Sequence, residues 1–121
     1  MASKFDKATL DFLRSADEIG IRAGKGAKRG VIIWAVVVGD AAFVRSVRGP
    51  SGKWYKVAAA DGKATLEIRD RLVPVRAIAV ADAPTIAAVS AEYLRKYAAS
   101  PYAKSMVKPE TLPTTLRLEP A

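Results

Sequence analysis

The sequence contains neither cysteine nor histidine, and the two absences exclude several kinds of chemistry. Without cysteine there is no disulfide, no thiolate nucleophile and no cysteine-bound metal. Without histidine the chain lacks the commonest general base and the commonest transition-metal ligand. Serine–histidine hydrolysis and zinc hydrolysis are therefore excluded. The acidic residues show no clustered pattern that would indicate a metal site built from carboxylates, so we expect no bound metal.

Long apolar segments are also missing. The longest apolar run covers residues 31–38, which is far too short to cross a membrane. Residues 1–9 are mainly polar and carry lysines, whereas a signal peptide needs an apolar core. We therefore expect a soluble, cytoplasmic protein that does not associate with membranes. A chain of 121 residues predicts one domain, residues 1–121, with a hydrophobic core of its own.

The net charge of +8 is unevenly distributed along the chain. Residues 21–56 hold eight of the twenty basic residues and only one of the twelve acidic ones. The same segment contains both tryptophans, Trp34 and Trp54. Such a field attracts phosphate groups, whether on a cofactor or on nucleic acid. The alternative is a solubilising charge on surface loops.

Hydrophobic periodicity and turn residues predict an α+β fold with a mainly β core. The predicted helices cover residues 5–19, 54–60 and 83–98, with a shorter helical piece at 100–106. The predicted strands cover residues 31–38, 42–48, 64–69, 72–80 and 114–118. Five strands joined mostly by hairpins indicate a partly closed antiparallel barrel. A helix precedes this barrel, and a C-terminal helical segment comes before its last short strand.

Two segments are candidate binding elements. Residues 20–30 form a basic loop with three glycines, in which Lys28 and Arg29 could hold an anion against free backbone N–H groups. The spacing matches neither a Walker loop nor a dinucleotide fingerprint, and the alternative is a flexible, solvated connection. Arg45 and Arg48 lie on the second predicted strand, and a guanidinium suits phosphate or carboxylate.

Aromatic residues accompany these cations. Trp34 lies within the apolar run, where it is either a core residue or part of a ligand site. Trp54 and Tyr55 follow a glycine-rich turn and are flanked by Lys53 and Lys56. This pair could stack on a flat ring system or pack over the rim of the barrel.

Residues 33–58, IWAVVVGDAAFVRSVRGPSGKWYKVA, resemble a bacterial family known as domain of unknown function 2255. The matching features are Ile33-Trp34, Gly39-Asp40, Phe43-Val44-Arg45-Ser46, Gly49, Gly52 and Trp54-Tyr55. Later segments agree as well, namely Tyr93, Lys96-Tyr97, Ser100-Pro101-Tyr102 and Thr114–Leu118. The resemblance covers nearly the whole chain. The family has no established activity.

The same plan is distantly similar to split-barrel reductases that bind FMN or a deazaflavin. That similarity implies a split β-barrel, a homodimer, and a cofactor in a cleft at the barrel mouth. By this similarity the residues that would hold anionic groups are Lys28, Arg29, Arg45, Ser46 and Arg48, and those that would wall the ring are Trp34, Trp54 and Tyr55. The chain departs from the reductases in two respects. Its basic loop and second strand differ in length from theirs, and AKRGVII replaces their hydroxyl-rich phosphate-binding stretch.

Three hypotheses about function follow. The first is a domain that binds a small anionic ligand at a basic, aromatic barrel mouth and has no acid–base machinery of its own. The alternative is a flavin- or deazaflavin-dependent oxidoreductase, in which the cofactor would carry the hydride chemistry. The third is nucleic-acid binding through the basic segment and its aromatic pair, although no recognised nucleic-acid motif is present. None of the three identifies a catalytic residue.

Overall fold

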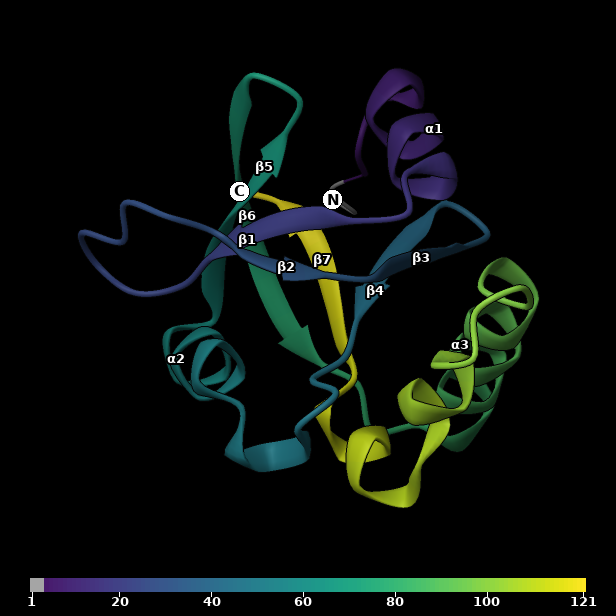
Figure 1. Cartoon of the computed structure of the whole chain (residues 1–121). Coiled ribbons are helices and arrows are strands. Elements are labelled where there is room, and N and C mark those ends of the chain that lie inside the picture. The colour runs from purple at the N-terminus through teal and green to yellow at the C-terminus, as the bar shows by residue number, and fades with distance from the viewer. Residues whose placement is uncertain (1–3) are drawn as a thin grey trace.

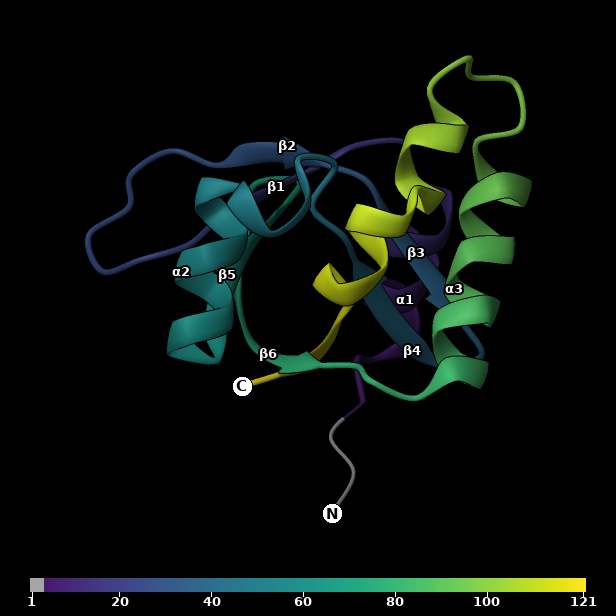
Figure 2. The same ribbon diagram turned by 90° about the horizontal axis from the view of Figure 1, so that it is seen from below.

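The computed structural model describes residues 4–121, and in this part of the chain seven strands form one antiparallel sheet. The sheet curls into a nearly closed barrel (Figures 1 and 2). Its strands are β1 (Ile19–Arg22), β2 (Val31–Ile33), β3 (Ala35–Val38), β4 (Ala41–Val44), β5 (Lys63–Ile68), β6 (Arg71–Ala79) and β7 (Leu116–Pro120). The strand order is β2-β1-β5-β6-β7-β4-β3. This architecture confirms the predicted α+β, partly closed antiparallel barrel.

Helices cover the barrel on three sides. Helix α1 (Lys7–Ser15) lies at one end, while α2 (Lys53–Asp61) and α3 (Ala83–Lys96) lie on opposite sides of the barrel (Figures 1 and 2). Three 3₁₀ turns complete the fold: η1 (Gly49–Ser51), η2 (Ala103–Val107) and η3 (Pro109–Thr114). Helices therefore lie at the N-terminal end and before the last strand, as predicted. No helix in residues 4–121 is both long and apolar enough to cross a membrane.

Closure of the barrel depends on the apolar run 31–38, which was predicted to be a single strand. That prediction is wrong, because the run breaks at Trp34 into β2 and β3. Strand β2 pairs with β1, whereas β3 pairs with β4. These two strands stand at opposite ends of the strand order. One residue, Trp34, thus connects the two edge strands of the sheet. Because the backbone pairs with β1 before Trp34 and with β4 after it, strand pairing is interrupted at this residue.

The N-terminal helix is shorter than the predicted 5–19. It is capped by Asp6, whose side chain accepts a hydrogen bond from the Thr9 backbone N–H at 2.8 Å, and it ends at Ser15. Residues 19–22, assigned to the end of that helix and the start of the basic loop, instead form β1 between β2 and β5. Alternation of Ile19 and Ile21, both buried, places one apolar face in the barrel, which favours a strand over a helix.

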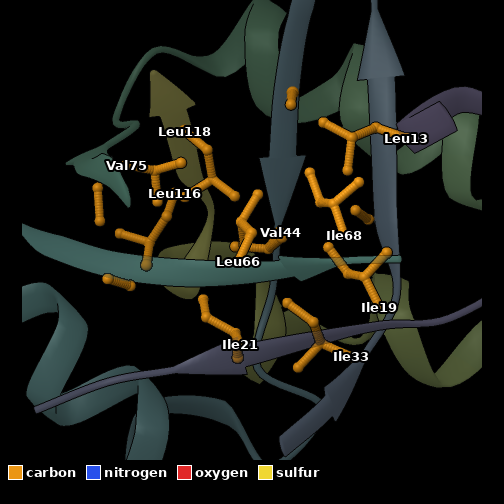
Figure 3. Packing of buried hydrophobic residues seen from close by; sticks show 14 of the residues in the cluster. Leu13, Ile19, Ile21, Ile33, Val44, Leu66, Ile68, Val75, Leu116 and Leu118 are labelled. Carbon is orange, nitrogen blue, oxygen red and sulfur yellow. The ribbon is translucent and has the colours of Figure 1, made fainter. Parts of the chain in front are cut away.

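Two apolar clusters hold these elements together. The larger fills the barrel, where side chains from several strands point toward one another, including Ile21, Val44 and Leu66 (Figure 3). The smaller lies between the outer face of β3 and β4 and helix α3. Strand β3 contributes to both, so the prediction that both faces of the run 31–38 are buried is correct for β3. It is wrong for β2, because Val31 and Ile32 are exposed.

The remaining boundaries differ in ways that affect the candidate site. Strand β4 ends at Val44 rather than at residue 48, so residues 45–48 leave the sheet. The predicted helical piece at 100–106 is η2, and η3 follows it before β7. The other predicted helices and strands are present, shifted by one or two residues at most ends. The segment after β4 and the turns before β7 meet, because η1 contacts η3.

Candidate functional site

A cavity of about 500 Å³ opens between β2, the segment after β4 and the turn η2. This volume is in the range of small-molecule sites. The residues that line the cavity are Val31, Ile32, Ile33, Trp34, Arg45, Ser46, Val47, Arg48, Gly52, Lys53, Trp54, Tyr102, Ser105 and Met106. Among these described residues there are three cations and no carboxylate. The cavity is therefore mainly apolar, with a purely positive set of charged side chains.

Trp34 forms a firmly supported wall of the cavity. Its ring stacks on Tyr97 with centroids 3.9 Å apart and planes 7° from parallel. Its backbone oxygen accepts a hydrogen bond of 2.7 Å from the hydroxyl of Tyr93, whose ring is completely buried. One face of the Trp34 ring is thus covered by Tyr97, and the rest of the ring can contact a ligand in the cavity. The break between β2 and β3 is what brings this side chain to the opening.

Lys96 supports the same wall from behind. Its Nζ donates to the backbone oxygens of Leu13 at 2.9 Å and Ala35 at 2.7 Å, and lies 5.2 Å from the centroid of the Tyr97 ring. Partial burial lowers the pKa of Lys96 to about 8. This lysine joins α1, β3 and α3 and does not reach the cavity, so its role in the structure is to hold elements together.

Arg45 is the largest fully buried side chain, with only 1% of its surface exposed. Its guanidinium donates to neutral oxygens alone: Thr115 Oγ1 at 2.9 Å, Ser90 Oγ at 2.8 Å, the Met106 carbonyl at 3.0 Å and the Ile86 carbonyl at 2.9 Å. It also lies over the ring of Tyr93, 5.6 Å from the centroid. Burial lowers the pKa of Arg45 below its usual value.

These contacts give Arg45 a structural role at the cavity. Four of the five guanidinium N–H groups are accounted for by protein acceptors, and those acceptors come from α3, η2 and the residue before β7. Arg45 therefore fixes the C-terminal wall of the cavity, including Met106, against the end of β4. Little of its hydrogen-bonding capacity remains for a ligand.

Ser46 and Gly52 lie close to each other in the lining of the cavity. Ser46 is buried, and its backbone N–H donates to Thr114 Oγ1 at 3.0 Å. A Cβ atom added to Gly52 would lie 2.2 Å from Ser46 Oγ, so only glycine leaves room for the serine hydroxyl. Gly52 is also the N-cap of α2. The hydroxyl thus lies beside the start of that helix.

Two exposed cations, Arg48 and Lys53, line the same cavity as Ser46 and Gly52. Neither takes part in an ion pair within residues 4–121. Four large apolar side chains stand around the same opening although they are substantially exposed: Val31, Ile32, Val47 and Tyr102. A contiguous exposed apolar patch of this kind marks a binding surface more often than does a single exposed side chain.

The structure brings together five of the eight predicted site residues. Trp34, Arg45, Ser46, Arg48 and Trp54 line one cavity. The other three do not line it. Lys28 and Arg29 are exposed on the loop between β1 and β2, which projects from one side of the barrel (Figure 1). The Tyr55 hydroxyl is directed to the Pro113 carbonyl, 3.4 Å away, while its ring meets Trp54 edge-on.

Sequence reasoning missed several lining residues. Lys53 was noted only as a neighbour of the aromatic pair, although its place at the first position of α2 could have been inferred from the glycine before it. Tyr102 lies in the Ser-Pro-Tyr segment shared with the resembled family, which was the available signal. Met106 and the exposed side chains of β2 carried no local signal, because their place at the cavity depends on long-range pairing.

Fold and cavity together define the class of protein, which is a nearly closed antiparallel barrel with a mainly apolar, positively charged cavity. The chain belongs to a family described as uncharacterised proteins conserved in bacteria, DUF2255, whose model matches residues 9–118. This confirms the resemblance drawn from the sequence. No curated protein matches the chain. Among solved structures it is similar to conserved hypothetical protein Rv2991 from Mycobacterium tuberculosis, with 12% identity, a TM-score of 0.61, and coverage of 98% of this chain and 81% of that one. At this identity the similarity extends to the fold alone.

Proposed function

We propose that this protein binds a small ligand that combines a flat aromatic ring with an anionic group. The observation that carries the proposal is the composition of the cavity, where Trp34, Trp54 and Tyr102 accompany Arg48 and Lys53 without any lining carboxylate among residues 4–121. Aromatic rings supply stacking surface, and unpaired cations attract an anion into an otherwise apolar space. No acid–base pair is needed for binding.

The more specific candidate is FMN or a deazaflavin, which would make the protein an oxidoreductase. A cavity of about 500 Å³ with aromatic walls and cations suits such a ring and its phosphate. Trp34 and Trp54 would contact the ring, and Arg48 with Lys53 would hold the anionic tail. When bound, the cofactor would supply hydride transfer, while the protein would orient the ring and exclude water.

The first test is an absorbance spectrum of the purified protein, followed by titration with FMN and a deazaflavin. We expect saturable quenching of tryptophan fluorescence. The change Trp54→Leu should weaken binding roughly 5- to 150-fold, because stacking on an aromatic side chain contributes about 1–3 kcal/mol. Tyr55→Phe is the matched control, since Tyr55 lies outside the cavity. A clean spectrum and no titration with either cofactor would remove the flavin candidate.

We also propose that a second copy of the chain covers the mouth of the cavity. The support is the apolar patch, in which Ile32 and Tyr102 are 61% and 68% exposed. Light scattering should then report about twice the chain mass of 12.9 kDa, and Ile32→Asp should reduce it toward one chain. A wild-type monomer at high concentration would contradict the homodimer and leave the ligand proposal to its own test.

A further inference from the structure

Helix α2 starts at the cavity and has no group of its own at its N-terminus. Its N-cap is Gly52, which offers no side chain, and no acidic residue lies in the first turn. The N–H groups of the first turn of a helix lack intrahelical partners and carry partial positive charge. The first helical bond after Gly52 is made by the N–H of Lys56 at 3.0 Å. Gly52, Lys53 and Trp54 all line the cavity.

The Ser46 hydroxyl independently indicates a ligand at the same place. Its side chain is 99% buried, yet Oγ makes none of the side-chain hydrogen bonds found within residues 4–121. No fully enclosed side-chain oxygen in that part of the chain lacks a partner, so this hydroxyl must be reached from the cavity. It lies beside Gly52, as the 2.2 Å approach to an added Cβ shows. The hydroxyl of this nearly buried serine therefore has its hydrogen-bonding capacity free for a molecule in the cavity.

The number of donors at this position identifies the chemistry of the anion. Ser46, Arg48, and Gly52 with Lys53 at the start of α2 all line the same cavity. A hydroxyl, the first N–H groups of a helix and two cationic side chains are therefore available to one ligand. A carboxylate offers two oxygens and one charge. A phosphate monoester offers three terminal oxygens and nearly two charges at neutral pH, which matches two cations and a helix N-terminus.

We propose that Ser46, Arg48, Lys53 and the N-terminus of α2 form a subsite for a phosphate monoester. This inference rests on the proposed function, because the phosphate belongs to the ligand whose ring occupies the cavity. It assigns the anion to the start of α2 rather than to the basic loop that carries Lys28 and Arg29. It also separates Arg48, which would bind the ligand, from Arg45, which positions the cavity wall.

The test compares FMN with riboflavin, which differ by the phosphate alone, using quenching of tryptophan fluorescence. We expect FMN to bind at least about tenfold more tightly than riboflavin, because charge-assisted hydrogen bonds contribute about 1.5–3 kcal/mol each. The ratio should fall toward one in Arg48→Gln and decrease in Ser46→Ala. Ser46→Ala should not change the free energy of unfolding, since its hydroxyl has no partner in the protein. Lys28→Gln is the control and should keep the ratio.

The outcomes of these experiments test the phosphate subsite separately from the proposed function. Equal affinity for FMN and riboflavin in the wild type would overturn the phosphate subsite and leave ring binding intact. If neither compound binds, the flavin candidate of the proposed function fails, and phenyl phosphate then tests the subsite alone by ³¹P line broadening. Broadening that Arg48→Gln removes and Lys28→Gln retains would support the subsite, whereas no broadening would overturn it.

Discussion

Replacement of Arg45 by alanine is expected to lower the free energy of unfolding by about 3–5 kcal/mol. The guanidinium makes four hydrogen bonds, and because the donor is charged each has a net contribution of about 1.5 kcal/mol. Its buried methylenes add about 2 kcal/mol. Part of this sum is offset, because an unneutralised guanidinium is costly to bury and the Met106 carbonyl also accepts from Thr111.

The measurement is urea unfolding followed by tryptophan fluorescence and far-ultraviolet circular dichroism. With a slope near 2 kcal/mol per molar urea, the midpoint should fall by roughly 2 M. Arg45→Met should lose less stability than Arg45→Ala, because methionine fills most of the vacated space. Arg48→Ala, three residues along and exposed, is the matched control and should change stability by less than about 0.5 kcal/mol.

Two outcomes distinguish a structural arginine from a ligand-binding one. A cooperative Arg45→Ala protein that loses less than about 1 kcal/mol but no longer binds FMN would refute the structural assignment. Large destabilisation, with ligand affinity retained in the folded fraction of Arg45→Met, would support it. The same pair of measurements on Arg48→Ala should give the reverse pattern, with stability kept and affinity lost.

Three further predictions can be checked in solution. Gly49→Ala should lower the free energy of unfolding, measured in thermal melts, by about 2–3 kcal/mol. The backbone φ at Gly49 is +66°, and the new Cβ would lie 3.0 Å from the Glu110 carbonyl oxygen. Gly26→Ala has a similar φ but open space around the new Cβ, so it should cost only about 1 kcal/mol. Burial lowers the pKa of Lys96 from 10.5 to about 8. Between these two pH values the folded chain has lost the Lys96 proton while the unfolded chain still holds it, so the free energy of unfolding rises with pH. The free energy of unfolding should rise by about 1 kcal/mol between pH 7.5 and 9.5, because solvent screens part of the effect on a partly exposed amine. It should not rise in Lys96→Met. Single-stranded DNA should show no steeply salt-dependent affinity; such affinity would instead support nucleic-acid binding.

Local patterns were sufficient for the elements whose partners are close in sequence. The Gly39-Asp40 turn joins β3 and β4 as a two-residue hairpin, with Gly39 at φ +63°. The hairpin of β5 and β6 and the helix capped by Asp82 are likewise specified by adjacent residues. In each case the paired residues lie in one helix or in two strands that are adjacent along the chain, so alternation and turn chemistry identify the element.

Elements defined by distant partners were not accessible in the same way. Strand β1 is four residues long and follows a helix with only three residues between them, so its apolar residues extend the helical pattern. Its partners, β2 and β5, come later in the chain. The break at Trp34 has the same origin: eight consecutive apolar residues give no sign that the first three pair with one strand and the last four with another.

Arg45 shows why residue type alone could not distinguish a structural arginine from a ligand-binding one. An arginine near an apolar run needs an anion or solvent to offset its burial, and both alternatives pointed to a ligand site or an exposed strand end. The structure contains a third solution, because α3, η2 and the residue before β7 supply neutral oxygens from positions 41 to 70 residues away. Strand β4 ends at Val44, so the backbone turns after Arg45. Arg48 is exposed, so of the two arginines to which the sequence offered an anion-binding role, Arg48 has the more hydrogen-bonding capacity left for a ligand.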